Sequence, residues 1–406
     1  MTDLDPGLTT GERIRISRER RGMTRPVVAG LVGRSPDWLK KIENGDRDLR
    51  SIGMLVQLAN VLHINDISVL TGGAPMPVTA GKLSHEAVPL IREAMHTVAF
   101  QPLPPEIPTP DVLKGRVEQA WLLWHTSRHQ RTEVGALLPS LIVSAHACVK
   151  VNEGAGHRVA QAAMGDLYRL VQRLLAHISE PELYWLALDR ARAASEAADN
   201  PISLALGAWT VSIGQRAAGF VEDAVRTAEL GMSVIRPHLA DGGLDALAAY
   251  GQLNLQAATS EALDGRSGPA EGYLAEARRI AETLPGGYWH PQSAFAMSNV
   301  DVHSITIGVN LARPGETLLR AEGIDPAGVQ SRERRSRLLL DIAYGHHQKR
   351  ETAAAVHFLG EACEVTLEGV RFVPGARALA LAIEKDAKGP LRASAVALAE
   401  SLGVAA

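Results

Sequence analysis

The sequence predicts an all-α protein in which a five-helix head precedes a stack of α-α helix pairs. Apolar residues recur at spacings of three and four through most of the chain, as on one face of a helix. No segment alternates apolar and polar residues as a half-buried strand does. Hydrophobic residues make up 46% of the chain and charged residues 21%, a composition typical of globular proteins and unlike that of disordered ones.

The length of 406 residues predicts more than one domain. Glycine and proline gather at residues 71–82 and again at 101–111, and the proline-rich second stretch disfavours helix. We therefore expect a head at residues 1–71, a linker with one helix at 72–111, and a helical body at 112–406.

Five short helices are predicted in the head, at about residues 10–22 and 25–32, between Ser35 and Gly45, at 51–62 and at 66–70. Gly33 provides the residue of positive φ that a tight corner between two helices needs. Ser35 can cap the third helix, and Pro36 suits its first turn.

These residues resemble a known motif. The segments "VVAGLVGRSPDWLKKIENG" and "LVQLANVLHINDISVL" are similar to the repressor-type helix-turn-helix of the xenobiotic-response-element (XRE) family, which includes the phage lambda and 434 repressors. The matching positions are Ala29, Gly33, Ser35 and Ile42 to Gly45, whereas Arg34 stands where the family usually has an aliphatic residue. The resemblance implies a transcription regulator that acts as a homodimer on a roughly palindromic site in double-stranded DNA.

The resemblance also implies which side chains contact DNA. Base edges would be met by the start and one face of the third helix and by the following loop, and phosphates by flanking cations. A lysine donates to guanine, and an aspartate accepts from cytosine N4. The expected base contacts are Pro36, Asp37, Lys41 and Arg47, with Ser35 at the cap, and the expected phosphate contacts are Arg25, Lys40 and Arg50.

Each of these side chains also has an ordinary structural explanation. The two lysines suit a solvated helix face, and Asp37 favours the positive end of the helix dipole. Arg47 and Arg50 can pair with the neighbouring acids Asp46 and Asp48 at the surface, which stabilises little.

Trp38 lies four residues before Ile42 and next to Leu39, at the edge of the predicted buried stripe. We expect it to pack in the head, with contact to a sugar-phosphate or a base methyl as the alternative.

Charge is unevenly distributed between the two parts. Residues 10–71 hold 11 Lys and Arg against 7 Asp and Glu, although the whole chain has a net charge of −3. Only the head is therefore expected to meet a polyanion.

A small-residue pattern recurs in the body. It begins at Ala224, Ala270, Thr317 and Ala355, and a partner residue stands twelve positions before each, at Ser212, Ala258, Ile305 and Ala343. Small side chains let paired helices approach closely, and stacked pairs bury a continuous core. The pattern resembles degenerate tetratricopeptide repeats over about residues 180–370, and an irregular helical array is the alternative.

In such a stack the first helix of each pair lines the concave face. The side chains expected there as ligand contacts are Trp209, Asn254, Asn299, His303 and Arg337. Amide side chains offer donors and acceptors for gripping a peptide backbone, and the layout resembles peptide-sensing quorum regulators and actinobacterial regulators. The ligand would be a signalling peptide or a small molecule. A solvent-lined groove without a ligand is the alternative, as is a DNA-localised scaffold whose repeats bind a partner protein.

No catalytic constellation, cofactor motif or metal site is found, so an enzyme is not expected. His125 and His129 have helical spacing but no acid or cysteine near them in sequence, and packed or solvated histidines are expected instead. The two cysteines, Cys148 and Cys363, suit a reducing cytoplasm. No apolar leader or run of membrane-spanning length is found, so no membrane partner is expected.

Overall fold

The computed structural model describes residues 8–47, 49, 52–62, 64, 68–72 and 83–404. Within these ranges the chain forms helices and no strand, which confirms the all-α prediction, and an isolated bridge pairs Leu83 with Ile178.

The head contains α1 (Thr10–Arg20), α2 (Arg25–Leu31), α3 (Pro36–Glu43), α4 (Ile52–Val61) and α5 (Ser68–Thr71). The next helices are α6 (Val88–Thr97), α7 (Pro110–Thr126), α8 (Gln130–Val151), α9 (Gly154–Leu175) and α10 (Pro181–Ala197). Four pairs follow, α11 (Pro201–Ala217) with α12 (Val221–Ile235), α13 (Gly243–Leu263) with α14 (Ser267–Glu282), α15 (Met297–Asn310) with α16 (Pro314–Ala321), and α17 (Arg332–Gln348) with α18 (Thr352–Val365). The chain ends with α19 (Leu367–Arg371), α20 (Pro374–Asp386) and α21 (Pro390–Ser401).

The five head helices begin and end close to the predicted residues because local signals fix them. Thr9 and Glu12 form a reciprocal capping box at α1. The hydroxyl of Ser35 accepts a hydrogen bond of 3.2 Å from the backbone N–H of Trp38, and Gly33 has a φ of 66° at the corner between α2 and α3.

Each of the four helix pairs is joined by a connection of three residues. The middle residue has a positive φ in every case, at Gly219 (89°), Gly265 (79°), Ala312 (54°) and Arg350 (61°). In the first connection the N–H of Phe220 donates to the carbonyl of Gln215 at 2.9 Å, the hydrogen bond that closes a Schellman motif. Four pairs therefore reverse direction in the same way.

Small residues lie where the paired helices touch, at the predicted Ser212 and Ala224 and at Thr317, whose close neighbour is Gly308 rather than the predicted Ile305. The hydroxyl of Ser212 donates to the carbonyl of Ala224 at 2.6 Å, across the twelve-residue separation seen in the sequence. A Cβ on Gly308 would come within 2.4 Å of the hydroxyl of Thr317. Larger side chains at these positions would separate the helices.

Helices α6 to α10 share one core at the N-terminal end of the body. Ile91 and Met95, in the helix predicted for the linker, are buried in this core beside Trp121. One helix, α8, is long and apolar enough to cross a membrane, which differs from the sequence analysis. Its Leu138 and Ile142 are buried in the same core, as in a central helix of a bundle.

Helices α7 and α8 meet α17 and α19 and close this part of the body into a ring, with α20 and α21 following beyond it. On one side, the Glu368 carboxylate accepts from the backbone N–H of Arg131 at 2.8 Å and of Thr132 at 3.2 Å, so α19 caps the start of α8. On the other, His125 of α7 makes a 2.8 Å hydrogen bond to the hydroxyl of Ser331, directly before α17. Burial lowers the pKa of His125 to about 3, so it is a neutral packed histidine.

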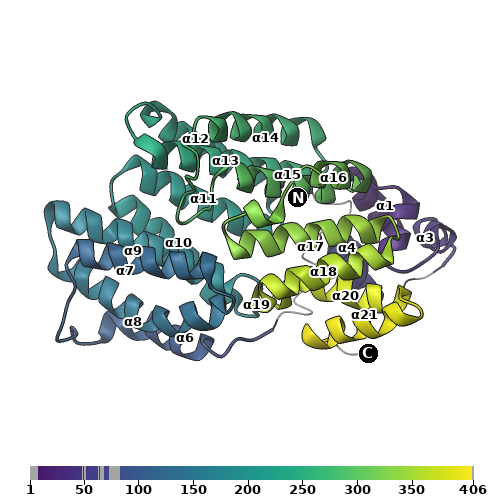
Figure 1. Ribbon diagram of the computed structural model, residues 1–406, viewed down its shortest axis with the longest axis horizontal. Helices are drawn as coiled ribbons and strands as arrows, with labels where there is room; N and C mark the ends of the chain where they lie inside the picture. The colour runs from purple at the N-terminus through teal and green to yellow at the C-terminus, as the bar shows by residue number, and fades with distance from the viewer. Residues whose placement is uncertain are drawn as a thin grey trace.

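The head lies on the connections between the helix pairs, beside the C-terminal helices (Figure 1). The Arg21 guanidinium donates to the carbonyl of Leu263, at the end of α13. Ala312, in the connection after α15, packs against the hydrophobic core of the head. The head thus contacts successive members of the stack.

Candidate nucleic-acid interface

Helix α3 is fixed in the head by its inner face and leaves its outer face in solvent. Leu39 and Ile42 are buried in the head core. Asp37, Lys40 and Lys41 are exposed on the opposite side. The short α2, the turn at Gly33 and α3 therefore present one polar helix face from a rigid support.

A buried ion-pair cluster holds α3 against α1 and α2. The side chain of Glu43 is fully buried, and its carboxylate lies 2.5 Å from Nε of Arg18 and 2.6 Å from Nε of Arg25. The hydrogen bond to Glu43 raises the pKa of Arg18 further, against the effect of its burial. One carboxylate thus joins three helices.

The geometry is that of two helices joined by a tight glycine turn, with the second helix exposed. Residues 10–67 match a family model described as a helix-turn-helix domain. Residues 10–67 are a helix-turn-helix domain. No curated protein matches the chain. The helix-turn-helix domain indicates a DNA-binding regulator.

The predicted base contacts lie together on the exposed face of the helix-turn-helix domain. Ser35 and Pro36 are exposed at the start of α3. Nζ of Lys41 lies 2.8 Å from a carboxylate oxygen of Asp37, and the hydrogen bond from Lys41 lowers the pKa of Asp37. Arg47 is exposed in the following loop, where its backbone N–H donates to the carbonyl of Lys41 at 3.1 Å.

The predicted phosphate contacts are placed differently from one another. Lys40 is exposed on α3. Arg25 is bound to the buried Glu43, so its guanidinium supports the fold, and 37% of its side chain remains exposed for a phosphate. Arg50 lies outside the described residues.

Trp38 is half-buried and packs against the hydrophobic core of the head, the position expected for it. The guanidinium of Arg34 lies over its ring, with Cζ 5.8 Å from the ring centroid. Arg34, the departure from the family pattern, thus covers the outer side of Trp38 at the start of α3.

A cleft of about 930 Å³ separates α2 and α3 from the body. On the domain side it is lined by Arg34, Lys41 and Arg47, among others. The body adds three cations, Arg350 from the connection after α17, Lys385 from the end of α20 and Lys388 from the connection after it. Nζ of Lys385 would lie 3.4 Å from a Cβ on Gly33, so the body reaches the turn before α3.

The expectation that only the head meets a polyanion left out these cations of the body. The signal available was the pair Lys385 and Lys388, since the chain has few lysines and two of them stand three apart. The net charge of the body does not reveal this pair, because the body as a whole is acidic.

The predicted ligand contacts fall into two groups. Asn254 and Asn299 are buried and bonded inside the protein, Asn254 to the carbonyl of Tyr250 at 2.9 Å and Asn299 to the side chain of Gln252 at 3.1 Å. Trp209, His303 and Arg337 instead lie near further arginines on the inner side of the ring.

His303 is a neutral acceptor on this inner side of the ring. The Thr259 hydroxyl donates to the carbonyl of Leu255 at 2.8 Å, so it accepts from Nδ1 of His303 at 3.0 Å. Burial, and then the positive charges of nearby arginines, hold the pKa of His303 well below its usual range. Its Nε2 has no hydrogen-bond partner among the described residues and is left as a free acceptor.

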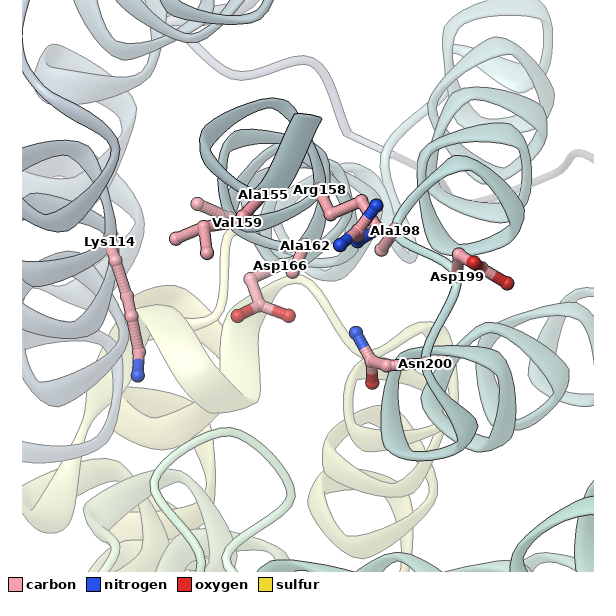
Figure 2. A pocket seen from close by; sticks show the side chains of 10 residues that line it. Lys114, Ala155, Arg158, Val159, Ala162, Asp166, Ala198, Asp199 and Asn200 are labelled. Atoms are coloured by element: carbon pink, nitrogen blue, oxygen red, sulfur yellow. The ribbon is translucent and has the colours of Figure 1, made fainter. Parts of the chain in front are cut away.

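A second, smaller hollow of about 340 Å³ lies between α7, α9 and the connection after α10 (Figure 2). Its lining mixes charges of both signs, from Lys114 and Arg158 to Asp166 and Asp199. Asp166 is already paired with the buried Arg169. This hollow therefore shows no preference for a ligand of either charge.

Proposed function

We propose that the protein is a sequence-specific transcription regulator of the XRE type, controlled by a ligand in its helical body. The supporting observation is where the helix-turn-helix domain contacts the body. The domain packs against the connections of successive helix pairs, and its α3 faces the cleft. A change in the curvature of the stack would move those connections and with them the domain. The body is proposed to be of the tetratricopeptide type, to bind a signalling peptide or a small molecule, and to act in the cytoplasm without catalysing a reaction.

The regulator is proposed to act as a homodimer on a roughly palindromic operator. One reading helix contacts few base pairs, and two linked domains about one helical turn apart gain affinity by their effective concentration. Genome-wide DNA binding, measured with and without native culture extract, tests both proposals. We expect an inverted-repeat motif whose occupancy changes with extract, and occupancy that is unaffected by extract would contradict ligand control.

The second candidate is a scaffold whose repeats bind a partner protein while the head localises it on DNA. The ring of helix pairs offers the same inner surface to a peptide segment of a partner. Mass spectrometry of the purified chain separates the two, because a co-purified protein supports the scaffold and a bound small ligand supports the sensor.

Lys41→Ala should reduce discrimination between operator variants by about 1 to 3 kcal/mol, since Lys41 is the exposed donor on the reading face. Binding to operators altered at single positions measures this, with Lys40→Ala as the control on the same helix. Lys40→Ala should weaken operator and random DNA about equally. Equal losses on both DNAs for Lys41→Ala would contradict its role.

Lys385→Ala together with Lys388→Ala should weaken binding to operator and random DNA alike, because phosphates carry no sequence information. We expect the slope of log affinity against log salt to fall by about one for each phosphate that the variant no longer neutralises. The salt dependence of binding measures this, and Lys114→Ala, an exposed lysine of the second hollow, is the control. An unchanged slope would show that the body does not contact the operator.

A further inference from the structure

Four arginines converge on the inner side of the ring from helices that lie far apart in the sequence. Arg173 comes from α9, Arg216 from α11, and Arg334 and Arg337 from α17. Their charges act together on His303 of α15. We call these four residues the arginine cluster.

Only half of the arginine cluster is neutralised by the protein. Arg334 lies 3.3 Å from the carboxylate of Glu333, and Arg337 lies 3.2 Å from that of Asp341. Neither Arg173 nor Arg216 forms an ion pair with a carboxylate in the part of the chain that the structure describes. The Glu333 carboxylate also acts on Arg173 across a longer distance, but two carboxylates face four guanidinium groups, so the arginine cluster keeps a surplus of positive charge.

The side chains of Arg173 and Arg216 are half-buried, so their charges are only partly hydrated. Burial lowers the pKa of Arg173 and of Arg216 to about 10 each, and the neighbouring arginines add to the effect. A buried charge without a partner is unfavourable, and a bound anion would supply the missing partner. If the cluster served stability alone, we would expect a carboxylate to pair with each of these arginines.

The indole of Trp209 lies beside Arg173 and carries an unused hydrogen-bond donor. Trp209 is 2% exposed, and its indole N–H has no acceptor among the described residues. The guanidinium of Arg173 lies over its ring, with Cζ 5.4 Å from the centroid. Trp209 and Arg216 are seven residues apart on α11, hence on one face of the helix.

The arginine cluster remains accessible from solvent. The side chain of Arg337 is 35% exposed and that of Glu333 is 21% exposed. Arg173 and Arg216 are half-buried rather than sealed. A small solute can thus reach the guanidinium groups, which lie where little bulk water competes for them.

We propose that the arginine cluster and Trp209 bind the anionic group, a carboxylate or a phosphate, of the small ligand that the ring accepts. Guanidinium groups offer paired donors that match the oxygens of either group, and the indole N–H adds a further donor. Anion binding itself does not depend on the proposed function. Only the statement that the anion is part of the regulatory ligand rests on it.

The test uses the full chain and two anions, inorganic phosphate and acetate, each against chloride at equal ionic strength. Binding to the folded state raises the melting temperature with anion concentration. We expect phosphate, acetate or both to raise it in the unaltered protein, and the more effective anion identifies the ligand chemistry. Arg216→Gln should abolish the rise, and Arg158→Gln, in the hollow of Figure 2, should leave it intact.

A second measurement separates loss of the site from loss of the fold. Arg216→Gln removes an unpaired buried charge, so it should raise the melting temperature in chloride alone, whereas a purely structural role for Arg216 would lower it. Arg173→Gln should behave in the same way. Equal responses to phosphate, acetate and chloride, or a phosphate response that survives both variants, would overturn the proposal.

The outcomes for the site and for the regulator are distinguishable. Anion binding without any change in operator affinity would keep the site and refute ligand control through it. The reverse result is that culture extract changes operator affinity while neither anion changes the melting temperature. That result would support ligand control and overturn the anion site.

Discussion

Glu43→Gln should lower the free energy of unfolding of the helix-turn-helix domain by about 3 to 5 kcal/mol, the usual loss when a buried ion pair is broken on one side. The carboxylate is fully buried and binds Arg18 and Arg25, so its removal leaves Arg18 buried without its main partner. A domain of this size has a total stability of only about 5 kcal/mol. We therefore expect the variant to lose DNA binding through unfolding of the domain, with the body intact.

Hydrogen exchange measures this, because it reports the stability of head and body amides separately. Glu19→Gln is the matched control, since Glu19 lies 3.1 Å from Arg18 but is 55% exposed. The control should change stability by less than about 1 kcal/mol. Protection of the head amides in Glu43→Gln equal to that of the control would refute the importance of the cluster.

Glu368→Ala should open the ring and lower the free energy of unfolding of the body by about 2 to 3 kcal/mol, as expected for hydrogen bonds to a charged group. The carboxylate accepts two backbone N–H groups at the start of α8, and the hydroxyl of Thr132 at 2.6 Å. The substitution removes all three bonds and the cap of a long helix. Urea unfolding followed by circular dichroism measures the loss.

Glu364→Ala is the control for this second experiment. Glu364 also belongs to the contact between the ends of the body, but its backbone carbonyl accepts from Arg128 and its side chain is exposed. Its truncation should leave the unfolding midpoint nearly unchanged. Equal shifts in the two variants would show that the Glu368 carboxylate does not hold the ends together.

The sequence predicts those parts of the structure that depend on neighbouring residues. The corner at Gly33 and the cap at Ser35 are local signals, and the structure confirms both. The pairing of Ser212 with Ala224 could also be predicted, because close crossing helices need small residues at a fixed separation.

Contacts between distant residues could not be predicted in this way. His125 and Ser331 are 206 residues apart, and they meet only because many small rotations between helices add up to a closed ring. Glu43 belongs to the predicted end of α3, but nothing in its neighbours shows that its carboxylate binds Arg18. The cations Lys385 and Lys388 also lie far from α3 in the sequence. They line the cleft beside α3 only because the head packs against the body.

The connections between the helix pairs carry a backbone cost that differs along the stack. Glycine adopts the positive φ freely at Gly219 and Gly265, whereas Ala312 and Arg350 adopt it at some cost. Both of the costly connections line the cleft beside the head. The cleft beside the head is therefore bordered by the two connections with the higher backbone cost, whereas the Arg21 contact lies beside the relaxed Gly265.

Closure of the ring changes how the body loses its structure. A linear array of helix pairs frays from its two free ends, because each terminal pair has only one neighbour. In this body α7 and α8 contact α17 and α19, so the N-terminal end of the stack is held by helices near its other end, and α20 and α21 remain as a terminal pair. Helices α9, α11 and α17, which carry the inner arginines, lie within this closed part of the body, so we expect them to unfold together.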